Sequence, residues 1–86
     1  MNDTNNLLRL PKVMEITGLA RSMLYLRIRQ GLMTPPIKHG ERCSAWPTHE
    51  VLTINAAHIA GRPIDEIRSV VSRLRQERTN MAETWR

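Results

Sequence analysis

Glycines and prolines interrupt this chain at short intervals and limit it to short elements of secondary structure. Proline suits the first turn of a helix, and a helix-like segment begins at Leu10-Pro11 and ends at Gly18. A second segment runs from Arg21 to Gln30 and stops at Gly31, since glycine is the usual left-handed residue after a helix. Two helices joined by a tight turn are therefore predicted, an arrangement typical of a helix-turn-helix.

The periodicity of the sequence changes after Pro35-Pro36, because these residues cannot continue a helix. Residues 37–46 form two short segments on either side of Gly40, a pattern that indicates a β-hairpin. Trp46, at the end of this hairpin, is expected in the core, where it would hold the hairpin against the helices. A hairpin directly after the second helix makes the predicted helix-turn-helix a winged one.

Two more helices are predicted after the hairpin. Thr48 is a suitable N-cap for a helix over residues 49–60, and Glu50 stands in its first turn, where a carboxylate favours the helix dipole. Gly61-Arg62-Pro63 ends this helix, and a fourth one is expected over residues 64–78. The side chains expected to face inward are Val51, Leu52, Ala56 and Ile59 in the third helix, and Ile64, Ile67, Val71 and Leu74 in the fourth.

The predicted fold class is mainly α with a small β-hairpin: a winged helix-turn-helix in the order helix, helix, hairpin, helix, helix. A chain of 86 residues suffices for one domain, expected at residues 8–78 between a flexible N-terminus at 1–7 and a flexible tail at 79–86. No apolar run approaches the roughly 20 residues that cross a bilayer, and no signal peptide is recognised at the start. With Cys43 alone, no intrachain disulfide is expected. These features predict a cytoplasmic protein without a membrane partner.

The positive charge is concentrated in the first half of the chain. The formal net charge is +5. Residues 1–47 carry seven basic and three acidic side chains, whereas residues 48–86 carry six basic and five acidic ones. This asymmetry predicts that the first half faces an anion and that the second half packs or associates.

The second helix has one face suited to a DNA groove. Leu24 and Ile28 lie four residues apart and take the core side. The candidate DNA-contacting residues of this recognition helix are Arg21, Ser22, Tyr25 and Arg29, with Leu26 and Arg27 beside them. Arginine binds guanine bidentately, and hydroxyl groups bind phosphates or base edges. The alternative is the solvated face of an ordinary helix.

The hairpin and the start of the first helix supply further basic candidates. The wing candidates are Lys38, His39, Gly40 and Arg42, and the candidates for phosphate contacts are Arg9 and Lys12. A basic wing can lie over phosphates or enter the adjacent minor groove, although a generic exposed hairpin is the alternative. The histidines and Cys43 have no strong metal-ligand spacing. No phosphate loop or nucleophile motif is present, so no enzyme, metal or cofactor is expected.

Several segments together resemble the AlpA family of small phage and mobile-element regulators, which are related to excisionases and to the DNA-binding part of MerR proteins. The resemblance rests on Leu8-Arg9-Leu10-Pro11-Lys12-Val13, Thr17-Gly18-Leu19-Ala20-Arg21-Ser22-Met23-Leu24-Tyr25, Gly31, Pro36-Ile37-Lys38, Gly40, Arg42, Trp46 and Glu50-Val51. Residues 60–68 are similar to the second helical pair of MerR-type domains. The order Leu26-Arg27 departs from the family pattern, so either Leu26 faces DNA or the helix is slightly rotated.

The resemblance implies a bacterial protein associated with the nucleoid, which binds double-stranded DNA sequence-specifically in one of two roles. One is an excisionase, or recombination directionality factor, which binds and bends attachment-site DNA and biases a tyrosine or serine integrase toward excision. The other is a transcriptional regulator of an integrase or excision gene. The apolar stripe of the fourth helix is either core or a contact between copies side by side on DNA. A protein-binding adaptor that does not touch DNA is an alternative of a different class.

Overall fold

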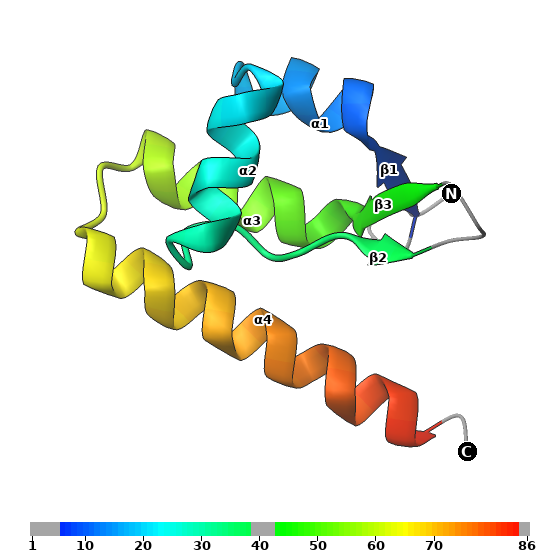
Figure 1. Ribbon diagram of the computed structural model, residues 1–86. Coiled ribbons are helices and arrows are strands. Elements are labelled where there is room, and N and C mark those ends of the chain that lie inside the picture. The colour runs from blue at the N-terminus through cyan, green and yellow to red at the C-terminus, as the bar shows by residue number, and fades with distance from the viewer. Residues whose placement is uncertain (1–5, 39–42, 85–86) are drawn as a thin grey trace.

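The computed structural model describes residues 6–38 and 43–84, and within them the predicted order of elements is present (Figure 1). The elements are β1 (Leu7–Arg9), α1 (Leu10–Thr17), α2 (Arg21–Arg29), β2 (Ile37–Lys38), β3 (Ser44–Pro47), α3 (Thr48–Ile59) and α4 (Ile64–Thr84). The mainly helical fold with a small antiparallel hairpin is that of a winged helix-turn-helix, which confirms the predicted fold class.

The corner between α1 and α2 is built from three residues of the predicted turn. Gly18 has a φ of 72°, and its N–H donates to the Met14 carbonyl at 2.8 Å. The Thr17 hydroxyl donates to the Val13 carbonyl at 2.8 Å and accepts the Leu19 N–H at 3.3 Å. Because only glycine adopts this positive φ without strain, Gly18 fixes the angle at which α2 leaves α1.

The hairpin belongs to a three-stranded antiparallel sheet in the order β1-β3-β2. The sequence did not predict β1, which pairs with the far side of β3 and places Leu8 opposite Trp46. Thr48 is not the N-cap of α3 as predicted, since the helix begins at Thr48 itself. Its N–H and its hydroxyl both donate to the Asn6 carbonyl, at 2.8 and 2.7 Å. Strand β1 and these two bonds tie the start of the chain to the wing.

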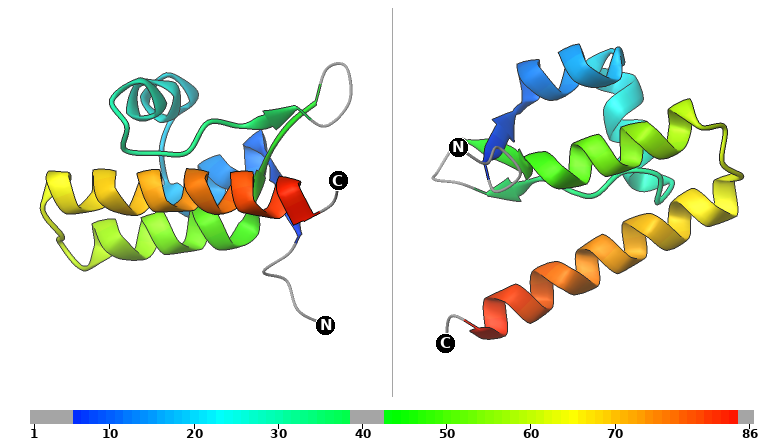
Figure 2. Two further views of the ribbon diagram at one scale, coloured as in Figure 1. Left: turned by 90° about the horizontal axis from the view of Figure 1, so that it is seen from below. Right: turned by 180° about the vertical axis from the view of Figure 1, so that it is seen from behind.

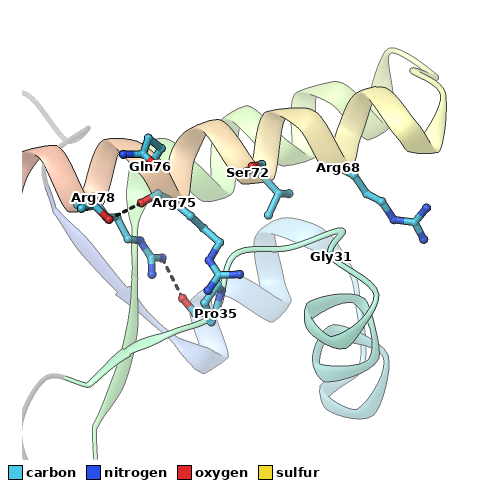
Figure 3. Close-up of a pocket in the computed structure, with 9 residues that line it drawn as sticks. Gly31, Pro35, Arg68, Ser72, Arg75, Gln76 and Arg78 are labelled. Atoms are coloured by element: carbon cyan, nitrogen blue, oxygen red, sulfur yellow. Dashed lines mark hydrogen bonds between the residues drawn. The ribbon is translucent and has the colours of Figure 1, made fainter.

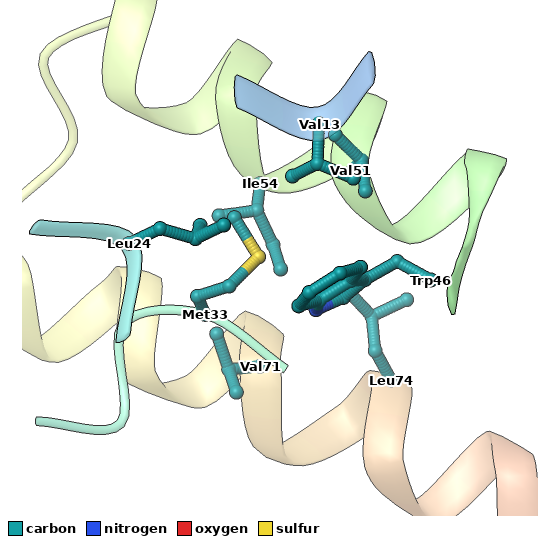
Figure 4. Close-up of a cluster of buried hydrophobic side chains, with 8 residues drawn as sticks. All are labelled: Val13, Leu24, Met33, Trp46, Val51, Ile54, Val71 and Leu74. Atoms are coloured by element: carbon teal, nitrogen blue, oxygen red, sulfur yellow. The ribbon is translucent and has the colours of Figure 1, made fainter. Parts of the chain in front are cut away.

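The core collects side chains from all four helices around Met33 and Trp46 (Figure 4). Its buried members are Val13, Leu24, Met33, Trp46, Val51, Ile54, Val71 and Leu74. Trp46 is fully buried, and its indole N–H donates to the Thr34 carbonyl at 2.9 Å. The prediction that Trp46 holds the wing against the helices is therefore confirmed.

Helix α3 is rotated relative to its predicted orientation. Val51 is buried as expected, but Leu52 is 47% exposed and Ile59 is 79% exposed, and Ala56 is also exposed. Two polar residues, Glu50 and His58, turn inward instead because each finds a partner from another helix. In α4, Ile67, Val71 and Leu74 are buried as predicted, whereas Ile64 is 54% exposed at the first position of the helix.

Helix α4 continues to Thr84, six residues beyond its predicted end, so most of the predicted tail is helical. A buried ion pair anchors this longer helix. The Arg78 guanidinium donates to both carboxylate oxygens of Glu50, at 2.8 and 2.6 Å, and to the Pro35 carbonyl at 2.9 Å. Helices α3 and α4 form an antiparallel pair, and α2 and strand β2 lie on one side of it (Figure 2, left). No helix of the described residues is both long and apolar enough to cross a membrane.

Candidate nucleic-acid interface

The first turn of α2 is electrostatically unusual. The N-cap residue Ala20 makes no side-chain hydrogen bond, no acidic residue stands in the first turn, and the first residue is Arg21. The N-terminal end of a helix carries a partial positive charge and unpaired N–H groups, which acidic or hydroxyl side chains usually satisfy. Here a cation is added to that positive end, so the start of α2 is suited to bind an anion.

The start of α1 has the same character. Its N-cap residue is Arg9, which makes no side-chain cap bond, and its first turn also lacks an acidic residue. Pro11 occupies the first turn, where the missing N–H is not needed. Both helices of the helix-turn-helix therefore have an arginine at the start, as the N-cap of α1 and as the first residue of α2, and neither has a compensating carboxylate in its first turn.

Residues from both helix starts line one shallow hollow of about 230 Å³. Its lining consists of Arg9, Leu10, Pro11, Arg21, Tyr25, Cys43 and Ser44. Arg9 and Arg21 are exposed, while Tyr25 is half-buried and has the Arg21 guanidinium over its ring at 5.9 Å. This cation–π contact favours one position of the Arg21 side chain. No acidic residue is found among the described residues of the hollow.

The structure thus brings together part of the predicted site. Arg9, Arg21 and Tyr25 meet at the hollow, which β3 completes through Ser44. Ser22 and Arg29 are exposed on α2 but do not line it. Lys38 is exposed in β2 and pairs in register with Ser44, at the base of the wing.

Lys12 lies apart from this group, with its ammonium 3.4 Å from the Glu15 carboxylate on the exposed side of α1. Three predicted wing residues, His39, Gly40 and Arg42, lie outside the described residues. In the part of the chain that the structure describes, no three His, Cys, Asp or Glu side chains are grouped so that they hold a metal ion.

The structure resolves the orientation of Arg27, which is directed away from the hollow. Its Nη1 lies 3.2 Å from Nε2 of His58 on α3. Since a guanidinium only donates, Nε2 accepts, and the proton of the neutral imidazole is on Nδ1. Leu26 is half-buried and also stays outside the hollow. Arg27 therefore fastens α2 to α3, and the departure from the family pattern falls on residues that do not meet Arg21 and Tyr25.

This arrangement favours the neutral form of His58. Burial lowers the pKa of His58 below its ordinary value of 6.5, and the positive charge of Arg27 lowers this pKa further. A hydrogen bond with the backbone of Leu32 acts in the opposite direction. The Leu32 N–H in turn donates to the Arg27 carbonyl at 2.8 Å, so the end of α2 is bonded to the segment that follows it.

Sequence reasoning missed Cys43 and Ser44 as residues of the hollow. Their approach to Arg9 depends on the pairing of β1 with β3, in which Arg9 stands opposite Ala45. The available signal was the alternation of Leu8, Arg9 and Leu10, which is compatible with a short strand before α1.

Comparison with known proteins places this geometry in a family. The family model described as "Prophage CP4-57 regulatory protein (AlpA)" matches residues 6–53, from β1 into α3. This segment contains every residue of the hollow. The "Uncharacterized protein ORF88" of Enterobacteria phage P4 is 44% identical over 55 residues, which are 64% of this chain and 62% of the phage protein. The chain thus covers less than two thirds of that relative's length. No solved structure matches the chain.

Proposed function

Because this chain belongs to the AlpA family of prophage regulatory proteins, we propose that it binds double-stranded DNA sequence-specifically and acts as a recombination directionality factor. The observation that carries the DNA-binding part is the hollow at which Arg9 and Arg21 meet the uncapped starts of α1 and α2. A phosphate seated there would supply the negative charge that both helix ends lack.

In this proposal α2 enters the major groove with its N-terminal turn foremost. Arg21 and Ser22 would reach base edges, where arginine reads guanine. Arg9, which lines the hollow, and Lys38, which pairs with Ser44 in the sheet, would bind phosphates and fix the register of α2 without reading sequence. The wing would extend this grip toward the neighbouring minor groove.

The small number of cations in this interface supports the excision role. Among the residues that the structure describes, the exposed cations of the interface are Arg9, Arg21, Arg29 and Lys38, so one copy is expected to neutralise only a few phosphates. Several copies side by side would be needed to hold an attachment site in a bent form that favours an integrase acting in the direction of excision. The description of the family as regulatory also favours a second role, transcriptional control of the integrase gene.

Salt dependence of binding tests the DNA grip. Fluorescence anisotropy with a labelled duplex from the ends of the host element should give a log–log slope of about −3 to −4, near −0.9 for each phosphate neutralised. Arg21→Ala should weaken the binding. Arg73→Ala removes the same charge from α4, outside the hollow, and serves as the matched control that should leave the binding unchanged. An affinity that does not depend on the salt concentration, or no binding to any duplex, would favour the protein-binding adaptor.

An excision assay separates the two regulatory roles. The integrase is expressed from an unrelated promoter, and excision is measured with and without this protein. The directionality proposal expects excision to require the protein under these conditions. If excision is equal in both strains and the native integrase transcript changes instead, the protein is a transcriptional regulator.

A further inference from the structure

A second, larger depression lies along α4, on the side that faces the connection between α2 and β2 (Figure 3). It measures about 570 Å³, and we call it the α4 groove. Its α4 wall consists of Arg68, Val71, Ser72, Arg75, Gln76, Arg78 and Thr79, and Gly31 and Pro35 contribute to the opposite wall. All the α4 residues lie beyond residue 53, where the family match ends.

The arginines of this groove differ in how far the protein itself engages them. Arg78 is bound by Glu50 and by the Pro35 carbonyl. The Arg68 Nε donates to the Gln30 carbonyl at 3.0 Å, and its Nη1 lies 3.7 Å from the exposed Asp65. The exposed Arg75 side chain makes no hydrogen bond or ion pair with any residue that the structure describes, and it projects toward Pro35 (Figure 3). Arg75 is therefore the cation available to a ligand.

The opposite side of α4 is balanced by its own acids. There Glu66 lies 3.8 Å from Arg62, and Glu77 lies 3.9 Å from Arg73. No acidic residue is among the described residues that line the α4 groove. One face of the helix thus neutralises itself, and the other keeps an uncompensated positive charge beside hydroxyl and amide groups.

We propose that the α4 groove binds an extended acidic segment of a partner protein. Arg75 would pair with a carboxylate, while Ser72, Gln76 and Thr79 provide hydrogen bonds to the backbone or side chains of that segment. Pro35 offers apolar contact. From residue 68 to residue 79 the helix rises about 16 Å. That length matches about five residues of extended chain.

The position of the groove favours a protein over the duplex. It adjoins Gly31, at the C-terminal end of α2, whereas the hollow lies at the start of that helix. If the proposed function is correct and the start of α2 faces DNA, the end of α2 points out of the major groove. The α4 groove then remains accessible on a DNA-bound copy, so this choice of ligand rests on the proposed function.

A displayed random peptide library tests the proposal. Peptides are selected on the full wild-type chain, and those that also bind Arg75→Glu are removed. We expect enrichment of sequences rich in Asp and Glu, with affinity reduced at least about tenfold by Arg75→Glu, as for the loss of a charge-assisted hydrogen bond. Arg73→Glu makes the same change of charge on the opposite side of the helix and should leave peptide affinity unchanged. Thermal unfolding of both variants verifies that they fold.

The outcomes separate this inference from the proposed function. If no enriched peptide depends on Arg75, the docking proposal is wrong. If Arg75→Glu weakens duplex binding much more than Arg73→Glu does, the groove contacts nucleic acid instead. If the wild-type chain binds no DNA but binds peptides in a manner that depends on Arg75, the proposed function is wrong and the groove remains a protein-docking site.

Discussion

The four helices form two pairs that begin in opposite ways. Helices α3 and α4 follow the usual electrostatic rule, with Glu50 in the first turn of one and Asp65 and Glu66 in the first turn of the other. Helices α1 and α2 have no acidic residue in the first turn, and an arginine stands at each start, Arg9 as the N-cap of α1 and Arg21 as the first residue of α2. The first pair is thus electrostatically incomplete in the free protein, which is the condition expected of a surface that binds an anion.

In the second pair, by contrast, the charged side chains bind each other and hold the two helices together. Glu50 is 1% exposed and is paired with Arg78, and both partners are bonded at short distances. The contrast also explains why the number of arginines in the sequence overestimates the number available to bind DNA. Arg27 and Arg78 are engaged by the protein itself, whereas Arg9 and Arg21 point into the hollow.

The largest expected effect is on stability and comes from the second pair. Arg78→Ala leaves the buried Glu50 carboxylate without its cation, which should cost about 3–5 kcal/mol in the free energy of unfolding. Urea denaturation measures this loss. Arg75→Ala, one turn earlier on the exposed side, should change stability by less than about 0.5 kcal/mol. Equal effects of the two substitutions would show that the ion pair does not anchor α4.

The next largest effect is on DNA affinity and comes from a substitution in the first helix pair. Arg21→Ala should weaken DNA binding by about 1–3 kcal/mol, the value of a bidentate base contact. Arg21→Glu should abolish binding yet stabilise the free protein by about 0.3–1 kcal/mol, because a carboxylate suits the start of a helix. The mirror change in the second pair, Asp65→Arg, should destabilise the fold and leave affinity unchanged. A loss of stability in Arg21→Glu would contradict the claim that the start of α2 lacks a compensating negative charge.

A smaller effect separates Arg9 from Lys12, which stand three residues apart. Arg9 lines the hollow, whereas Lys12 is paired with Glu15 outside it. Removing one phosphate contact lowers the salt slope by about 1, so Arg9→Ala should do so. Lys12→Ala should change the slope less. The salt slope of DNA binding is measured by fluorescence anisotropy for both variants. A larger change of slope in Lys12→Ala than in Arg9→Ala would show that DNA contacts the exposed side of α1 instead.

The smallest expected effect is a pH dependence of stability. The pKa of His58 is lowered in the folded protein, so the unfolded chain binds more protons as the pH falls below 6.5. The stabilising contribution of neutral His58 is complete above pH 6.5 and is lost as the pH falls through the lowered pKa of the folded state. Comparison of urea midpoints for wild type and His58→Gln across this range isolates the effect. An unchanged pH profile in His58→Gln would exclude His58 as its source.

The order of the elements could be predicted because the signals are local. Gly18, Gly31 and Pro35-Pro36 mark the ends of helices within a few residues. Strand β1 could not be predicted, because its three residues pair with a strand almost forty positions away and the alternation of Leu8, Arg9 and Leu10 is too short a signal to identify a strand. The face of α3 was predicted wrongly because Glu50 and His58 face inward only with Arg78 and Arg27 as partners.

The candidate site was predictable on α2 itself and less so elsewhere. The spacing of Leu24 and Ile28 was enough to direct Arg21 and Ser22 outward, and the structure shows both exposed. The contribution of Cys43 and Ser44 depends on the sheet and could not be predicted from periodicity. The contact between Arg27 and His58 joins residues 31 positions apart, which no local pattern reveals.

The central claim is that the hollow at the start of α2 faces DNA, and Cys43 tests it directly. Cys43 is the one cysteine of the chain and lines the hollow together with Arg21. The rate at which its thiol is alkylated is measured with and without a saturating duplex from the ends of the host element. The proposed interface predicts that the duplex slows alkylation and that an acidic peptide in the α4 groove does not. An unchanged rate on fully DNA-bound protein would contradict it.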